Sequence, residues 1–140
     1  MSTKFSKQYD LKKKSEISDR WGGNEELTRS WTPISRYFLA NYHRLSPHQG
    51  ADGLNSTEAM LLVHLLDFKW DENDPHPSVN TLATRLGLSR RRTRKVIQNL
   101  EDLGFLTRKP RVEGSTNAYD LQGLFDELME LYEADKEEGV

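Results

Sequence analysis

The feature that most constrains the fold is a pair of short amphipathic segments between residues 78 and 104, with a single glycine at the turn. Ser78 can cap a first helix that buries apolar side chains as far as residue 86. Gly87 can take the left-handed conformation that ends such a helix. Ser89 can then cap a second helix, which we expect to stop at Gly104. The sequence therefore predicts two consecutive short helices joined by a tight turn.

The second of these helices has two unlike faces. At 100° per residue, one side collects positions 93, 96, 97, 100, 103 and 104, which are Thr, Val, Ile, Leu, Leu and Gly. Arg91, Lys95 and Gln98 project from the opposite side, and Arg94 flanks them. We expect the apolar side to pack against the rest of the protein and the basic side to face outward.

Charge is distributed very unevenly along the chain. The whole chain has a formal net charge of −2, yet residues 85–111 carry nine basic residues against two acidic ones. Residues 120–140 show the reverse, with eight acidic residues against one lysine. The segment "RRR" (Arg90, Arg91 and Arg92) places cations where they oppose the helix dipole, at a cost of about 0.3–1 kcal/mol each. A solvated helix start is the plain alternative, but such an arrangement favours an anionic partner.

A basic hairpin is predicted directly after the second helix. "FLTR" reads as a short strand, "KPRVEGST" as a turn-rich tip and "NAYDL" as a returning strand. Arg108, Lys109 and Arg111 lie on it. Two short helices followed by a hairpin make a winged helix-turn-helix. We therefore predict a mainly α fold with a small β-hairpin (α+β), extended by helices at both ends.

Four regions are expected along the chain. Residues 1–30 form a flexible polar arm, and residues 31–53 form an N-terminal helix after Pro33 and a loop. Residues 54–121 form the winged helix-turn-helix domain. It begins with a central buried helix, capped by Asn55 and Glu58, whose apolar face reaches Trp70. Residues 122–140 form an acidic C-terminal helix that could serve dimerisation.

The sequence also resembles a known family, the bacterial winged helix-turn-helix domains of plasmid and phage replication initiators and small transcription regulators. The pieces that carry the resemblance are "LATRLGLSRR", "LEDLGFLTR" and "NAYDLQGL", and it covers roughly residues 54–125. It implies a positioning helix at residues 78–86, a recognition helix at 90–103 and a wing at 105–121. Arg92 departs from the family pattern, in which an apolar residue or Thr-Val usually follows "SRR". Winged helices also serve protein docking, so the resemblance alone leaves the partner open.

Double-stranded DNA is the partner that these patterns favour. An α-helix fits the major groove, and an arginine fork can bind guanine O6 and N7 together. Gln98 could read an adenine, while the hairpin cations would contact phosphates. We expect DNA contacts from Ser89, Arg90, Arg91, Arg92, Arg94, Lys95, Gln98, Arg108, Lys109 and Arg111. The predicted function is sequence-specific DNA binding, as a transcription regulator or replication-initiation factor. The alternative is a protein-interaction adaptor that docks an acidic partner.

Other classes of function find little support in the sequence. The four histidines have no metal-ligand spacing, and His64 is expected in a core or interface. No nucleophile constellation or glycine-rich phosphate loop is present, so we expect neither an enzyme nor a cofactor, metal or small-molecule ligand. Without cysteines, a secretory signal or a membrane-length apolar run, a cytoplasmic protein is expected. A homodimer is favoured, either through the C-terminal leucines or through the aromatic cluster near Phe38. In the alternative, those two segments cover each other within one chain.

Overall fold

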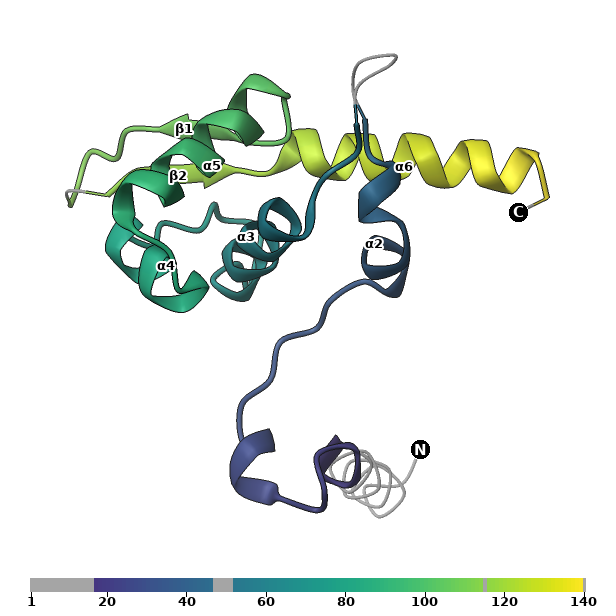
Figure 1. Cartoon of the computed structure of the whole chain (residues 1–140), viewed down its shortest axis with the longest axis horizontal. Helices are drawn as coiled ribbons and strands as arrows, with labels where there is room; N and C mark the ends of the chain where they lie inside the picture. The colour runs from purple at the N-terminus through teal and green to yellow at the C-terminus, as the bar shows by residue number, and fades with distance from the viewer. Residues whose placement is uncertain (1–16, 47–51, 115, 140) are drawn as a thin grey trace. The chain divides into compact units, whose positions relative to one another are not determined.

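The computed structural model describes residues 17–46, 52–114 and 116–139, and the chain divides into two units, Met1–Pro33 and Ile34–Val140 (Figure 1). In the first unit a helical turn at residues 17–20 is followed by the short 3₁₀ helix η1, Glu25–Thr28. Trp21 and Trp31 are exposed there. The predicted flexible arm of residues 1–30 therefore lies partly outside the described residues and stays a prediction.

The second unit contains the predicted helices and hairpin, so the expected mainly α fold with a small β-hairpin is confirmed (Figure 1). Its order is α2 (Arg36–Asn41), η2 (Tyr42–Arg44), α3 (Ser56–Asp67), α4 (Val79–Leu86), α5 (Arg90–Asp102), β1 (Thr107–Lys109), β2 (Ala118–Asp120) and α6 (Gln122–Glu137).

Local capping residues fix where the three central helices begin. Asn55 accepts a hydrogen bond from the Glu58 backbone, and the Glu58 carboxylate accepts one in return from the Asn55 backbone. The hydroxyls of Ser78 and Ser89 cap α4 and α5 in the same sense. Gly87 ends α4 with φ of 67°, a conformation that residues with a Cβ rarely adopt. The predicted caps and the predicted turn are therefore confirmed.

The hairpin is tied to the segment that enters α4. β1 and β2 are antiparallel, and Arg108 lies opposite Tyr119. The Tyr119 backbone N–H donates to the Pro75 carbonyl at 2.9 Å. The Thr116 hydroxyl donates to the His76 carbonyl at 3.0 Å. Because these bonds join residues 75–76 to the hairpin, the wing and the start of α4 are held next to each other.

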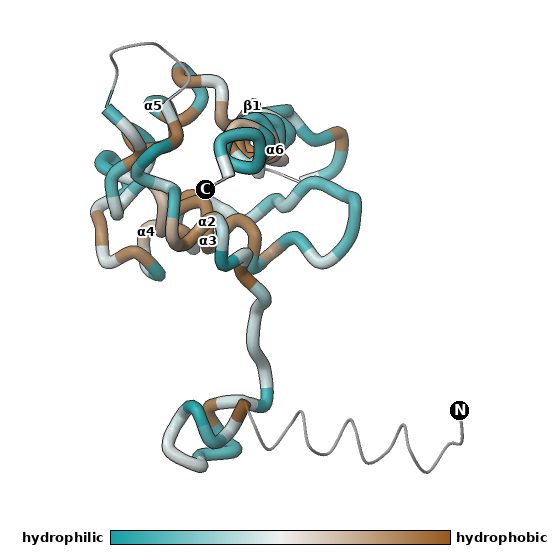
Figure 2. Tube along the Cα trace, turned by 90° about the vertical axis from the view of Figure 1, so that its right-hand side faces the viewer, coloured by the Kyte–Doolittle hydropathy of each residue, from teal (hydrophilic) through white to brown (hydrophobic). Residues whose placement is uncertain are grey.

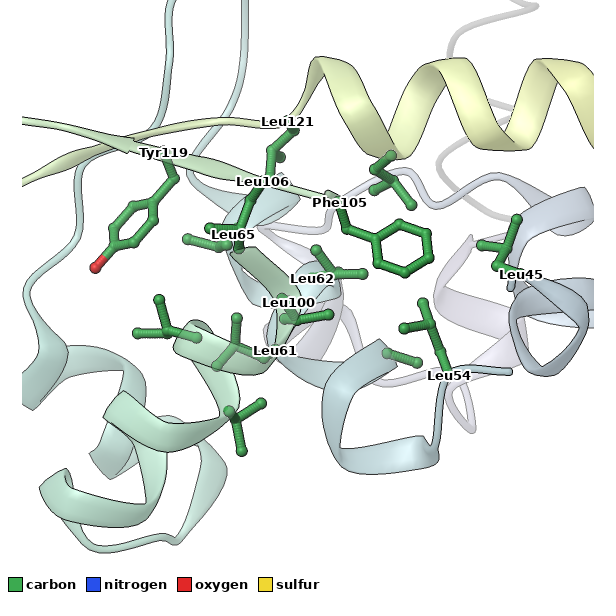
Figure 3. Packing of buried hydrophobic residues seen from close by; sticks show 14 of the residues in the cluster. Leu45, Leu54, Leu61, Leu62, Leu65, Leu100, Phe105, Leu106, Tyr119 and Leu121 are labelled. Atoms are coloured by element: carbon green, nitrogen blue, oxygen red, sulfur yellow. The ribbon is translucent and has the colours of Figure 1, made fainter. Parts of the chain in front are cut away.

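A single apolar cluster holds α3, α4, α5 and the hairpin together. Leu62 and Leu65 from α3 pack with Leu100 from α5 and with Phe105 and Leu106 before β1 (Figure 3). Figure 2 shows hydrophobic positions gathered around α2 and α3, with hydrophilic positions along much of the outer chain. Burial of this cluster supplies the main stabilisation of the fold.

Two details of the predicted helix faces are wrong. Trp70 was expected on the buried face of the central helix, but α3 ends at Asp67 and the Trp70 side chain is 66% exposed. A helical period no longer applies after the helix ends, so position 70 turns away from the core. Gly104 was expected on the apolar side of α5, but it follows the end of that helix and is exposed.

α2 and η2 pack against the second half of α6. The Arg44 guanidinium binds the Asp135 carboxylate through two hydrogen bonds, at 2.8 and 2.7 Å, and the Tyr37 hydroxyl donates to the same group at 2.5 Å. The rings of Tyr37 and Tyr132 meet edge to face at 5.4 Å. Hydrogen bonds from Arg44, then from Tyr37, lower the pKa of Asp135 to about 2. The intramolecular cover that the sequence left open is therefore present in the single chain.

Candidate nucleic-acid interface

The first half of α5 presents cations that have no acidic partner within the described part of the chain. Its buried face consists of Thr93, Val96, Ile97 and Leu100. The Ser89 hydroxyl accepts from the Arg92 backbone N–H at 3.1 Å, and the Thr93 hydroxyl donates to the Ser89 carbonyl at 2.9 Å. These bonds and the buried face fix the rotation of the helix. The side chains left exposed are Arg90, Arg91, Arg92, Arg94 and Lys95.

Two shallow hollows lie along opposite flanks of α5. One, of about 320 Å³, lies between α5 and the start of α3, and Arg92 and Lys95 line it. The other, of about 290 Å³, lies between α5, the start of α4 and the hairpin, and Arg90 and Arg94 line it. Arg91 lies between the two flanks on the face opposite Val96 and Ile97. The helix therefore carries positive charge on both flanks and at its outer edge.

The hairpin cations are arranged quite differently, because each of them has a partner within the chain. The Arg108 guanidinium donates to Glu101 from Nε at 3.1 Å and from Nη2 at 2.7 Å, and the Arg108 backbone N–H donates to the other oxygen of Glu101 at 2.7 Å. The Lys109 ammonium pairs with Asp120 at 2.9 Å and lies 3.8 Å from Asp74. The Arg111 guanidinium donates to the Thr116 hydroxyl at 3.0 Å.

These contacts shift the pKa values of the groups involved. Hydrogen bonds from the Arg108 side chain and backbone lower the pKa of Glu101. The pKa of Asp120 is lowered first by the Gln122 backbone N–H and then by Lys109. Both carboxylates therefore stay ionised at neutral pH and offset the positive charge of the hairpin.

Gln98 is also engaged inside the molecule. Its side-chain carbonyl accepts from Arg108 at 2.5 Å, and its amide donates to Asp102 at 2.8 Å. A glutamine that reads adenine must offer both groups to the base. To do so here, Gln98 would have to exchange both partners.

The ten predicted contact residues thus fall into two groups. Ser89 and the five cations without an acidic partner lie together at the start of α5. In contrast, Gln98, Arg108, Lys109 and Arg111 each have a hydrogen-bond or ion-pair partner within the chain. Contact with DNA stays a prediction for all ten. Sequence reasoning missed Tyr119, which is 2% exposed and lines the hollow beside Arg90 and Arg94. Its position within "NAYDL" indicated only a strand.

Metal binding and membrane insertion are two other possibilities for the described residues. No group of three or more His, Asp or Glu side chains among them could hold a metal ion. His64 is half-buried on α3, and burial lowers its pKa. No helix in the described ranges is both long and apolar enough to cross a membrane.

Comparison with known proteins finds similarity in the central part of the chain. Residues 52–106 match the family model of a helix-turn-helix domain. Protein YmfN of Escherichia coli (strain K12) is 36% identical over 64 residues, which are 46% of this chain and 14% of that protein. The chain thus corresponds to a small part of that relative's length.

One solved structure supports the fold over a longer stretch. It is the N-terminal domain of the DnaD protein from Geobacillus kaustophilus HTA426, with a TM-score of 0.58. The match covers 82% of this chain and 92% of that domain, at 24% sequence identity. At this level of identity the likeness establishes the shared fold.

Proposed function

We propose that residues 52–106, which form a helix-turn-helix domain, bind double-stranded DNA through the first half of α5. The observation that carries this proposal is the set of five exposed, unpartnered cations around that part of the helix. The major groove of B-DNA is about 12 Å wide and admits an α-helix of about 10–12 Å diameter. An arginine-rich helix start with an exposed outer edge suits that groove.

The division of the cations between two flanks supports a specific docking mode. A helix in the major groove has a phosphate backbone on each side. Arg90 and Arg94 would contact one strand, and Arg92 and Lys95 would contact the other. Arg91, between them, is best placed to reach base edges, where its planar fork can bind guanine.

The hairpin would then contribute more weakly. Lys109 and Arg111 could contact phosphates only by sharing or exchanging their present partners. Arg108 is held by Glu101 and Gln98, so it would mainly position the hairpin. We therefore propose that α5 carries most of the affinity and that the hairpin adds a smaller contact.

The finer proposal is that binding is sequence-specific, as in a transcription regulator or a replication-initiation factor, and that the protein acts by binding rather than by catalysis. The rival function is an adaptor whose basic face docks an acidic protein. Both would use the cations of α5. Sequence-specific DNA binding would give a preference among DNA sequences of equal length and charge, whereas docking of an acidic protein would not.

Selection of bound sequences from a random duplex library tests this directly. We expect a short consensus, and we expect that Arg91→Ala changes the preferred bases while Lys109→Ala leaves them unchanged. Recovery of duplexes without any consensus would leave only general backbone binding. Failure to retain any duplex at low salt would reject DNA as the partner.

We also propose that two copies bind together, because one winged helix reads only a short site and two-fold pairing doubles it. Leu39 on α2 and Met129 on α6 are each 54% exposed, so these helices retain apolar surface beyond their mutual contact. Light scattering at micromolar concentration tests the proposal. A mass near 16.2 kDa without DNA would reject a stable dimer.

A further inference from the structure

The hollow between α4, α5 and the hairpin combines three features that suit an anion. Its volume is about 290 Å³, and it is lined by the first residues of α4, by two arginines of α5 and by the hairpin. The residues that matter for the argument are Val79, Asn80, Arg90, Arg94, Asn117 and Tyr119. Each of the three sides contributes hydrogen-bond donors or positive charge.

The first side is the start of α4. The Ser78 hydroxyl accepts from the Thr81 backbone N–H at 3.0 Å, which satisfies that donor. The backbone N–H groups of Val79 and Asn80 come earlier in the helix and, among the described residues, donate to no acceptor. They sit at the positive end of the helix dipole.

The second side is the flank of α5. Arg90 and Arg94 line the hollow, are exposed and have no carboxylate partner in the described ranges. Their charges are therefore not neutralised within the chain, unlike that of Arg108 on the hairpin. A negative group in the hollow would have cations on one side and helix amides on the other.

The third side supplies the feature that points most clearly to a ligand. Tyr119 on β2 is 2% exposed, and no hydrogen bond of its hydroxyl is found among the described residues. Figure 3 shows the phenol ring directed away from Leu106 and Leu121, with its oxygen at the far end. No enclosed side-chain oxygen or nitrogen among the described residues lacks a hydrogen-bond partner, so the Tyr119 oxygen is the part of this buried side chain that stays open to the hollow. A hydroxyl in that position is free to donate to a ligand there.

Burial also keeps this hydroxyl in its donor form. It raises the pKa of Tyr119 above the ordinary phenol value, so the group holds its proton at neutral pH. The hairpin cannot easily withdraw the residue, because the Tyr119 backbone N–H is bonded to Pro75 at 2.9 Å. The hydroxyl is thus a fixed donor at the wall of a positively charged hollow.

We propose that this hollow binds a phosphate group and that the Tyr119 hydroxyl donates a hydrogen bond to one of its oxygens. The origin of the phosphate rests on the proposed function: if the protein binds DNA, the group is a backbone phosphate of the duplex beside α5. A free phosphate has the same chemistry and is the other source. Tyr119 is then a DNA-contact residue that carries no charge of its own.

The variant Tyr119→Phe removes only the hydroxyl oxygen and keeps the ring that packs in the core. Affinity for a labelled duplex is measured at several salt concentrations for the parent, for Tyr119→Phe and for Tyr42→Phe. Tyr42 is a matched control because its ring packs against Phe38 and no hydrogen bond of its hydroxyl is found in the described part of the chain. We expect Tyr119→Phe to bind roughly tenfold more weakly or worse, as for a hydrogen bond to a charged group.

The salt dependence identifies the kind of contact. A lost phosphate contact from a cation flattens the plot of log affinity against log salt by about one unit. Tyr119→Phe removes no charge, so its slope should equal that of the parent, and Tyr42→Phe should match the parent in both affinity and slope. If Tyr119→Phe binds the duplex as tightly as the parent does, the phosphate assignment is overturned while DNA binding stands.

A second measurement separates the two phosphate sources. The parent is labelled with ¹³C at the tyrosine Cζ and titrated with inorganic phosphate and with duplex. Saturable movement of the Tyr119 signal with either probe supports the hollow. If the parent binds no duplex but phosphate moves the signal, the proposed function falls and the phosphate site stands. If neither probe moves it, the assignment is rejected, even where Tyr119→Phe fails to fold.

Discussion

The first turns of α5 and the β-hairpin are both rich in cations, but of these cations only ones on the hairpin have acidic partners among the described residues. Arg108 is bound by Glu101 and Lys109 by Asp120, whereas Arg91 and Arg94 have no such partner among the described residues. A cation paired within the chain contributes to holding the fold. An unpaired one at a helix start slightly destabilises the fold and is available to an outside anion. The cations of the two regions therefore have different roles.

The largest expected effect of this difference is on DNA affinity. The double variant Arg91→Ala/Arg94→Ala should weaken binding to the selected duplex by roughly 1–3 kcal/mol per residue, because each arginine contacts a base or a phosphate. The melting temperature should not fall, since neither side chain has an internal partner. Fluorescence anisotropy and thermal melting measure the two properties. An affinity equal to the parent's, with the fold intact, would remove α5 from the interface.

Removal of a paired hairpin cation should instead lower the stability of the fold. Arg108→Ala should lower the free energy of unfolding by about 1 kcal/mol, because it breaks a two-bond contact with Glu101 in which both side chains are about 30% exposed. Urea unfolding measures this value, and Lys95→Ala, which removes an exposed cation without an acidic partner in the described residues, is the control. Should both variants unfold at the same urea concentration as the parent, the internal pairing of Arg108 would have no structural importance.

Acid should reduce the difference in stability between the parent and Arg108→Ala. The pKa of Glu101 is lowered from its ordinary value of 4.5 in the folded protein, so its pairing stabilises the fold at neutral pH. That contribution is lost as the pH falls below 4.5 and through the lowered pKa. Urea unfolding at pH 7, 5 and 3 should therefore show the difference between the two stabilities narrowing from pH 5 to pH 3. A constant gap across this range would exclude Glu101 as the partner that matters.

The smallest expected effect is an increase in the free energy of unfolding. Arg91 lies in the first turn of α5 without an internal partner, so Arg91→Ala should raise the free energy of unfolding by about 0.3–1 kcal/mol. Chemical unfolding at low salt is the suitable measurement, because salt screens the helix dipole. Arg91→Gln, which removes the charge and keeps most of the side-chain length, should behave likewise. Destabilisation by both substitutions would show that Arg91 has a structural role within the chain.

The contrast between the two regions also marks what the sequence could predict. Capping by Asn55, Ser78 and Ser89 was predictable because each cap acts within three residues. The buried and exposed faces of α5 were predictable for the same reason, since helical geometry fixes them locally. The length of the buried face of α3 was not predictable in this way: the face was expected to reach Trp70, but the helix ends at Asp67.

The partners of the hairpin cations were not predictable from local pattern. Arg108 reaches Glu101 across the helix–strand junction, and Lys109 reaches Asp120 on the opposite strand. These pairs depend on the register of the hairpin, which the sequence leaves open when the loop is long. The hollow at Tyr119 was even harder to predict from the sequence, because three separate elements line it. Net charge alone had made the two basic clusters look alike.

Salt dependence of duplex binding tests the central claim most directly. The parent is compared with Arg91→Ala/Arg94→Ala and with Arg108→Ala/Lys109→Ala, and the slope of log affinity against log salt is measured for each. Each cation released from a phosphate should flatten the slope by about one unit. We predict a loss of about one to two units for the α5 variant, and of less than one unit for the hairpin variant because its cations are already paired. A hairpin variant that loses about two units while the α5 variant keeps the parent's slope would contradict this assignment.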